Sequence, residues 1–153
     1  MKDIIIQLLT GMLGSLGFAL LFGLKKKYLL NAALGGLICC ALYQVGRLIF
    51  GSIFLACLAA SAFCALYSEV TARLKKAPST LFFITSVIPL VPGGSLYYAC
   101  SNAVIRDWEK AKYFSMLTLQ YALAIAAGAC VVWAIMITVE NIKKNKQTSS
   151  ENQ

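Results

Sequence analysis

Five long stretches of the sequence contain no charged residue, and they constrain the fold of this chain more than any other feature. They cover residues 4–24, 28–46, 48–68, 77–105 and 113–139, which are 21, 19, 21, 29 and 27 residues long and hold 117 of the 153 residues. Since a helix rises about 1.5 Å per residue, about 20 residues cross the hydrocarbon core of a bilayer, which is ~30 Å thick. The sequence therefore predicts an all-α integral membrane protein, a bundle of about five transmembrane helices.

The predicted helices are placed at residues 4–24, 28–46, 48–68, 78–105 and 113–139, within a transmembrane helical domain of residues 1–142. Residues 143–153 are predicted to form a polar tail in the cytoplasm. Only Arg47 divides the second helix from the third, so the chain must turn sharply near residues 46–51. The alternative is a four-span arrangement, which places both chain ends on one side and conflicts with the distribution of basic residues.

Composition excludes several classes of function. Of all residues, 59% are hydrophobic and 13% are charged, which is about half the charged share of a typical soluble protein. Only 36 residues lie outside the five stretches, and this is too few for a separate soluble catalytic domain. The sequence has no histidine, the commonest metal ligand and general base. We predict that the chain is not an enzyme and that it holds no cofactor and no metal.

Small side chains inside the spans are expected to be buried between helices. The six cysteines, at positions 39, 40, 57, 64, 100 and 130, lack the spacing of a metal site or a secreted disulfide framework, and we interpret them as small apolar residues. Other small residues predict close packing between helices of this chain, with a face for a second copy as the alternative. They are Gly11, Gly14, Ser15, Gly17, Ala32, Gly36, Ala56, Ala60, Ala122, Ala126, Cys130 and Ala134.

The net charge of +8 comes from basic residues that flank the apolar stretches, which is not the pattern of a nucleic-acid-binding surface. Alternating spans place nine basic residues on one side and five on the other. The nine are Lys25, Lys26, Lys27, Arg73, Lys75, Lys76, Lys143, Lys144 and Lys146, and the five are Lys2, Arg47, Arg106, Lys110 and Lys112. Because basic residues collect in the cytoplasm, the N-terminus is predicted outside and the C-terminus inside.

The fourth stretch contains Ile88-Pro89-Leu90-Val91-Pro92-Gly93-Gly94, and this segment predicts an interrupted helix. Each proline removes an N–H group and clashes with the preceding turn, and the two glycines weaken the helix further. Half-helices of about ten and about twelve residues flank the break, so it is expected near the middle of the bilayer. Non-helical backbone at that depth must be enclosed by protein or line a water-filled cavity.

The start of the second half-helix is the predicted substrate site. It is expected near Ser95, with unpaired N–H groups of Gly93, Gly94 and Ser95 at the positive end of a helix, which suits a carboxylate. Discontinuous helices hold the substrate in secondary transporters. The predicted substrate-binding residues are Pro89, Pro92, Gly93, Gly94, Ser95, Tyr97, Tyr98, Ser101, Asn102 and Arg47. Two alternatives remain open: a purely structural kink, and an Arg47 that only reaches towards the membrane surface.

Residues 77–104 resemble the threonine/serine exporter (ThrE-like) family of membrane proteins. The resemblance rests on a proline after the basic loop, a Phe-containing apolar run, and Ile88-Pro89-Leu90-Val91-Pro92-Gly93 followed by Tyr97. The other spans agree in length, hydropathy and order only. The chain is similar to the short, separate-chain version of the family's C-terminal membrane module. This resemblance implies a subunit of a secondary transporter that exports small carboxylate-bearing metabolites such as threonine, serine or succinate.

The same resemblance implies the setting in which the chain works. Family members of this size act with a larger membrane subunit of the same family, in the bacterial inner (cytoplasmic) membrane. The expected partners are that subunit, a small carboxylate solute and the lipid bilayer, with no nucleic acid. The alternative function is a noncatalytic assembly subunit or a channel-like subunit, whose broken helix only packs against a partner.

The charge distribution makes a testable prediction about topology. Reporter proteins fused after Lys27, Lys76 and Lys146 should all report a cytoplasmic location, because these sites belong to the side with nine basic residues. A reporter fused after Lys112 serves as the control and should report the outside. An extracytoplasmic signal from any of the first three fusions contradicts the arrangement of five spans.

Overall fold

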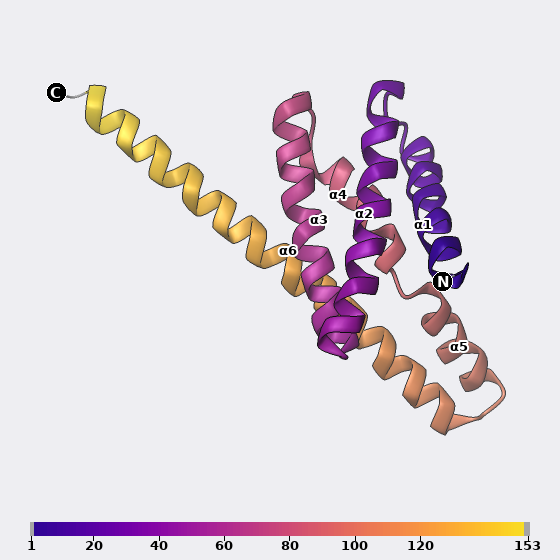
Figure 1. Ribbon diagram of the computed structural model, residues 1–153. Helices are drawn as coiled ribbons and strands as arrows, with labels where there is room; N and C mark the ends of the chain where they lie inside the picture. The colour runs from indigo at the N-terminus through magenta and orange to yellow at the C-terminus, as the bar shows by residue number, and fades with distance from the viewer. Residues whose placement is uncertain (1, 152–153) are drawn as a thin grey trace.

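The computed structural model describes the backbone of residues 2–151 and the side chains of residues 4–142. Its helices, in chain order, are α1 (Lys2–Leu21), α2 (Lys26–Phe50), α3 (Ile53–Lys75), α4 (Ser79–Val87), the 3-10 helix η1 (Ile88–Leu90), α5 (Gly93–Val104) and α6 (Trp108–Glu151). No strand occurs within residues 2–151. The prediction of an all-helical chain is therefore confirmed (Figure 1).

The described helices include four that are long and apolar enough to cross a membrane: Ile4–Leu21, Lys26–Phe50, Ile53–Lys75 and Trp108–Ile142. A fifth candidate span is broken, because Ser79–Leu90 and Gly93–Val104 meet at a bend of 56°. These spans agree with a bundle of about five helices whose fourth member is interrupted at Pro89-x-x-Pro92-Gly93-Gly94.

Helices α2, α3 and α6 are longer than the charge-free stretches predicted, whereas α1 ends at Leu21, three residues early. Helix α2 continues past Arg47 to Phe50, and only Gly51 and Ser52 separate it from α3. Gly51 makes this turn with a φ of 60°, which glycine adopts without strain, and its N–H group donates to the carbonyl of Arg47 at 3.2 Å. The second and third helices are thus separate, and Arg47 lies in the last turn of α2. Helix α6 also continues beyond residue 139, through most of the predicted polar tail.

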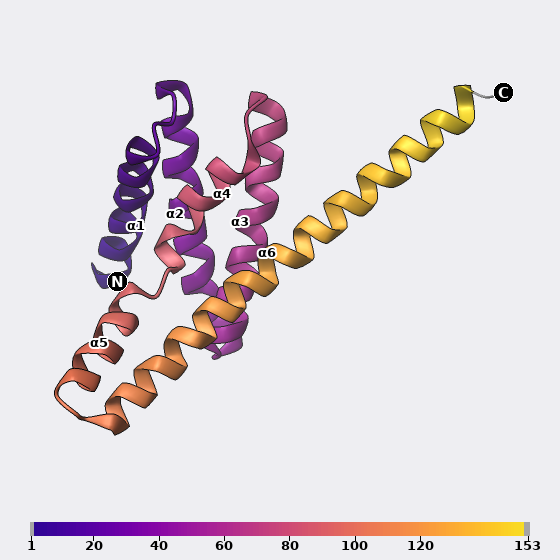
Figure 2. The same ribbon diagram turned by 180° about the vertical axis from the view of Figure 1, so that it is seen from behind.

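Three upright helices, α1 to α3, stand side by side, with α2 in contact with both of its neighbours (Figures 1 and 2). Helix α4 packs on α2 and α3, and α6 crosses α3 obliquely. Helix α5 packs mainly on the first part of α6, and the hairpin of these two extends beyond the α2–α3 turn. The α1–α2 and α3–α4 turns therefore share one end of the bundle, as alternating spans require.

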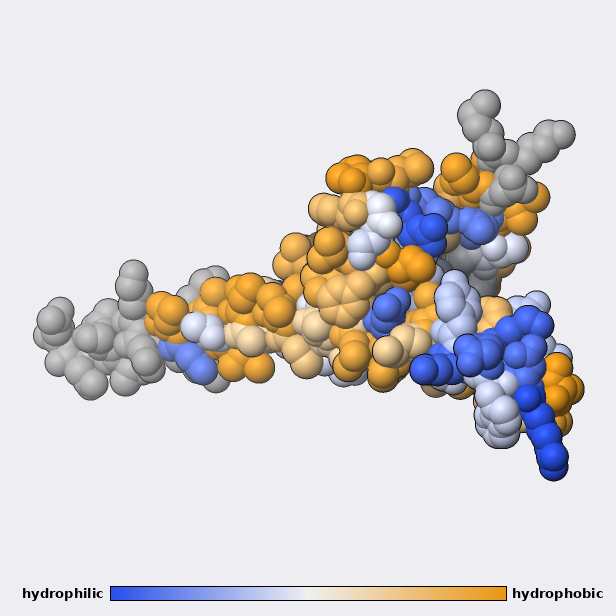
Figure 3. Space-filling model, turned by 90° about the horizontal axis from the view of Figure 1, so that it is seen from below, coloured by the Kyte–Doolittle hydropathy of each residue, from blue (hydrophilic) through white to orange (hydrophobic). Residues whose placement is uncertain are grey.

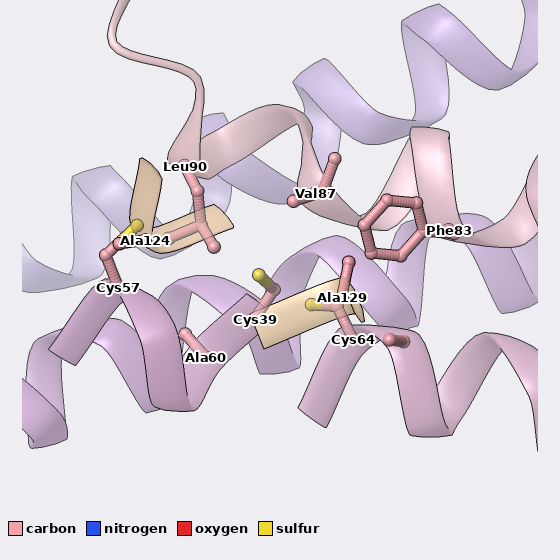
Figure 4. Close-up of a cluster of buried hydrophobic side chains, with 10 residues drawn as sticks. Cys39, Cys57, Ala60, Cys64, Phe83, Val87, Leu90, Ala124 and Ala129 are labelled. Atoms are coloured by element: carbon pink, nitrogen blue, oxygen red, sulfur yellow. The ribbon is translucent and has the colours of Figure 1, made fainter. Parts of the chain in front are cut away.

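The core lies where α2, α3, α4 and α6 meet, and it is built from small side chains around one aromatic residue (Figure 4). Its buried members are Cys39, Cys57, Ala60, Cys64, Ala65, Phe83, Val87, Leu90, Ala124 and Ala129. Cys40 is also buried, so the interpretation of the cysteines is confirmed for four of the six. It is wrong for Cys100 and Cys130, which are exposed, because their sides of α5 and α6 point away from the bundle.

Small residues bring the helices close together, as predicted, but not at every position named. Ala32, Ala56, Ala60 and Ser15 are fully buried, and a Cβ atom on Gly36 would lie 1.9 Å from Ser15 Oγ. Gly14 and Gly17 instead have nothing within 4 Å of such an atom.

The prediction is wrong for the small-residue stripe of α6. Ala122, Ala126, Cys130 and Ala134 are all exposed. The buried face carries Ala124, Gly128 and Ala129 instead. Its closest approach is at Gly128, where a Cβ atom would lie 2.0 Å from Ser61 Oγ and 2.6 Å from the Leu58 carbonyl oxygen. The helix carries small residues on two faces, and Gly128 selects the face that meets α3.

The outward surface is largely apolar, as a lipid-facing surface should be. Seen from below, the described residues show mostly hydrophobic side chains, and hydrophilic ones gather at the end that carries the α5–α6 turn (Figure 3). Leu48 and Val104 are 81% and 83% exposed, which is favourable in hydrocarbon and costly in water.

The contact at Gly128 predicts a difference between two glycine variants. Gly128→Ala should destabilise the protein by about 1–3 kcal/mol, the usual cost of overpacking, because the backbone of α3 blocks the new methyl group. The matched control is Gly17→Ala, which meets nothing within 4 Å and should leave stability unchanged or slightly higher. Thermal unfolding of the detergent-solubilised variants measures both. Equal stability of the two variants contradicts the α3–α6 crossing.

Candidate functional site

The break between α4 and α5 is a short non-helical connection held by two prolines. Helix η1 contains Pro89, Val91 is extended (φ −63°, ψ 122°), and Pro92 caps α5. The Val91 N–H group donates to the Ile88 carbonyl at 3.0 Å, which satisfies one of the carbonyls that the missing proline N–H groups leave free. The prolines thus end one helix and begin the next without a continuous hydrogen-bond ladder.

The second half-helix begins at Gly93, two residues earlier than predicted. The Gly93 N–H group donates to the Val91 carbonyl at 2.8 Å, and the first bond of α5 runs from Leu96 to the Pro92 carbonyl at 3.0 Å. The expectation of an unpaired Gly93 amide is therefore wrong. The amides of Gly94 and Ser95 make no backbone hydrogen bond among the described residues, as expected for the first turn of a helix. These two amides carry the positive end of the α5 dipole.

A cavity of about 370 Å³ lies at the break, which is the size of a site for a small molecule. Helix α2, the break, α5 and α6 all contribute to its wall. The lining residues are Tyr43, Pro89, Leu90, Val91, Pro92, Gly93, Gly94, Ser95, Tyr98, Phe114, Leu117 and Tyr121. The non-helical backbone is therefore covered by protein on one side and faces open space on the other.

A second cavity, of about 340 Å³, lies on the α1 side of the same break. It is lined by Gln7, Thr10, Gly11, Cys40, Tyr43, Gln44 and Pro89. Tyr43 and Pro89 line both cavities and form the partition between them. The Gln44 side-chain amide donates to the Gln7 side-chain oxygen, so this cavity offers uncharged polar groups.

Three helices present hydroxyl groups around the break. The hydroxyl groups of Tyr43 and Tyr121 hydrogen-bond to each other across α2 and α6, and Arg47 follows Tyr43 by one turn on the same face of α2. Thr118 Oγ1 lies 3.2 Å from Ser95 Oγ, and Ser95 Oγ donates to the Pro92 carbonyl at 3.1 Å. Hydroxyl groups from α2, α5 and α6 and the positive end of α5 therefore lie at the break.

The structure brings together most, but not all, of the residues that the sequence pointed to. Pro89, Pro92, Gly93, Gly94, Ser95 and Tyr98 line the larger cavity. Arg47, Tyr97, Ser101 and Asn102 are not among its lining residues, and Arg47 is exposed in the last turn of α2. Tyr97 is 67% exposed on another side of α5, and the Asn102 side-chain amide donates to the Tyr98 carbonyl at 2.7 Å, in the second half of α5.

Sequence reasoning missed the contribution of α2 and α6. Tyr43, Thr118 and Tyr121 lie at the break, although they are far from it along the chain. A signal was present: Tyr43 and Arg47 are four residues apart, and Thr118 and Tyr121 are three apart, so each pair shares one face of a helix. Neither spacing shows which partner the face meets, since that depends on how α6 crosses the bundle.

Acidic side chains are absent from the site among the residues whose side chains the structure describes. Within residues 4–142, no Asp or Glu lines either of the two cavities. Among the described side chains, Glu69 and Glu140 pair with Arg73, and Asp107 pairs with Lys110, all away from the break. An anion is the natural ligand for an arginine, several hydroxyl groups and free helix amides.

These features define a class of protein: a multi-pass helical membrane protein with a discontinuous span beside a cavity between helices. The family model described as "Threonine/Serine exporter, ThrE" matches residues 7–135. The chain belongs to this family of membrane exporters, and the resemblance inferred from residues 77–104 is confirmed. No curated protein and no solved structure matches the chain.

Proposed function

We propose that this chain is one subunit of a secondary transporter that exports small carboxylate-bearing metabolites, such as threonine, serine or a dicarboxylate like succinate. The observation that carries the proposal is the cavity at the break, which is lined by the start of α5 at Gly94 and Ser95 and by Tyr43 and Tyr121. Half-helix N-termini of this kind bind substrate carboxylates in secondary transporters.

The proposed binding mode follows from the free donors. The amides of Gly94 and Ser95 accept one carboxylate at the positive end of α5, and the Ser95 and Thr118 hydroxyl groups lie beside it. The tyrosine pair, on the α2 and α6 walls, orients the solute, and Arg47, one turn further along α2, attracts a second negative group. Pro89 and Pro92 keep this segment non-helical, because neither has the N–H group that a helical backbone hydrogen bond requires.

The charge of the site also bears on the substrate. A dicarboxylate finds amide and hydroxyl donors here, whereas the ammonium group of threonine or serine finds no acidic residue on the walls of the two cavities among the described side chains. Acceptors for an ammonium group would then come from backbone carbonyls or from another subunit. The proposal thus assigns carboxylate recognition to this chain and leaves recognition of the rest of the solute to its partner.

The proposed partner is a larger membrane subunit of the same family, and the proposed location is a bacterial inner membrane. Transporters are commonly built from paired repeats with two discontinuous helices, and this chain has one broken span. Helix α5 also packs mainly on α6 and leaves Leu96, Val104 and Ile105 exposed. This chain alone is therefore expected not to transport.

Efflux from cells that express both subunits tests the site. The Gly93→Leu, Gly94→Leu variant should lose at least about tenfold in efflux per assembled complex, because the leucine side chains block the carboxylate from the Gly94 and Ser95 amides, and losing a charged hydrogen bond costs about 1.5–3 kcal/mol. Neither side chain meets an atom within 4 Å of its Cβ position, so the variant should still fold, insert and bind its partner. Pro89→Ala should reduce efflux less, since Pro92 remains.

The matched control is Gly17→Leu, which also has open space around its Cβ position and should transport normally. Wild-type efflux from a well-assembled Gly93→Leu, Gly94→Leu variant contradicts the proposed site. Loss of assembly without loss of efflux per complex indicates the alternative, an assembly or channel-like subunit. Full transport by the purified chain alone in liposomes contradicts the need for a partner.

A further inference from the structure

Five lysines form a cluster of positive charge at the end of the bundle that carries the α1–α2 and α3–α4 turns. We call this group the lysine rim, and its members are Lys25, Lys26, Lys27, Lys75 and Lys76. All five side chains are exposed. They come from two turns that are about 50 residues apart in the sequence and lie at the same end of the molecule (Figure 1).

The two turns are held together by specific contacts centred on Tyr28. The Tyr28 hydroxyl donates to the Lys75 carbonyl at 3.1 Å, and Lys27 Nζ lies 4.8 Å from the centre of the Tyr28 ring. Beneath them, Tyr28 packs edge-on against Phe82 at 5.6 Å between ring centres. The rim is therefore part of the folded structure, because a buried aromatic contact fixes the spacing between its two halves.

Within residues 4–142, no acidic side chain pairs with a lysine of the rim. Among the described residues, the ion pairs are Arg73 with Glu69, Arg73 with Glu140, and Lys110 with Asp107. None of the five rim lysines takes part in one. At the opposite end, by contrast, Lys110 and Lys112 lie close in sequence to Asp107 and Glu109, so charges of both signs are mixed there.

Exposed apolar side chains accompany the rim. Leu21 and Leu74 are 79% and 77% exposed, and Phe22 is also exposed. They come from the same two turns as the lysines, so positive charge and bare apolar surface lie together at one level of the bundle. This combination matches a phospholipid, whose headgroup is charged and whose chains are apolar, better than it matches a soluble anion.

We propose that the lysine rim binds the phosphate headgroups of anionic phospholipids, with their acyl chains over Leu21, Phe22 and Leu74. Lysine side chains at a helix end lie along the apolar surface and place their ammonium groups at headgroup level. Clusters of four to eight basic residues beside a membrane span recognise anionic lipids in this way. The rim is remote from the break, so this binding does not depend on the proposed transport site.

Lipid binding to the purified full chain, or to its complex if it copurifies with one, tests the proposal. Native mass spectrometry should show phosphatidylglycerol retained in preference to phosphatidylcholine. The Lys75→Gln, Lys76→Gln variant should weaken phosphatidylglycerol binding by at least about fivefold, since each lysine near an anionic surface contributes roughly that factor. The matched control, Lys110→Gln, Lys112→Gln, removes the same net charge at the other end and should change binding less than about twofold, because Lys110 is already paired with Asp107 and acidic residues neighbour both lysines.

Three outcomes overturn the proposal. Equal losses in the two double variants mean that total charge, and not the rim, attracts the lipid. Competition by excess glycerol phosphate means that the rim binds free anions without their acyl chains. Equal retention of phosphatidylglycerol and phosphatidylcholine by the unaltered protein means that the rim has no preference for anionic lipid. A circular dichroism spectrum with intact helices shows that this protein is folded.

Discussion

Backbone amides and carbonyls need hydrogen-bond partners when they lie in hydrocarbon, and this requirement governs the arrangement around residues 88–95. Pro89 and Pro92 remove two links from the ladder of the fourth span. Part of the loss is repaired locally, by Val91 donating to Ile88 and Gly93 donating to Val91. Helices α2 and α6, which meet at the tyrosine pair, cover one side of the break. The break and the surrounding bundle therefore depend on each other, and the partly open space between them is the cavity.

Close packing of the helices brings them together around the break. Lipid offers little hydrophobic drive between helices, so contact depends on small residues. Gly128 brings α6 against α3 and Gly36 brings α2 against α1, and a core of cysteine, alanine and Phe83 fills the space between them. Because α6 crosses the bundle obliquely, its first half turns towards α5. That crossing places Thr118 and Tyr121 at the break.

Much of the fold was predictable from the sequence, because charge-free stretches of bilayer length and a Pro-x-x-Pro-Gly-Gly segment are local signals. The start of α5 at Gly93 was misplaced by two residues, since Pro92 itself serves as the cap. The role of Tyr43 and Tyr121 was not predictable, because it depends on which face of α6 meets α2. The wrong prediction that the stripe from Ala122 to Ala134 is buried has the same cause. Two faces of α6 carry small residues, and only the three-dimensional packing decides which of them meets α3.

The central claim is that the broken span lines a water-filled cavity that admits a carboxylate solute. Its most direct test is the reactivity of Gly94→Cys towards a membrane-impermeant thiol reagent, in an assembled complex whose six native cysteines have been replaced. We expect rapid labelling that added succinate or threonine slows, while Gly17→Cys, on the outer face of α1, stays unlabelled. Labelling of neither cysteine, or labelling of Gly94→Cys that no carboxylate slows, would contradict the claim.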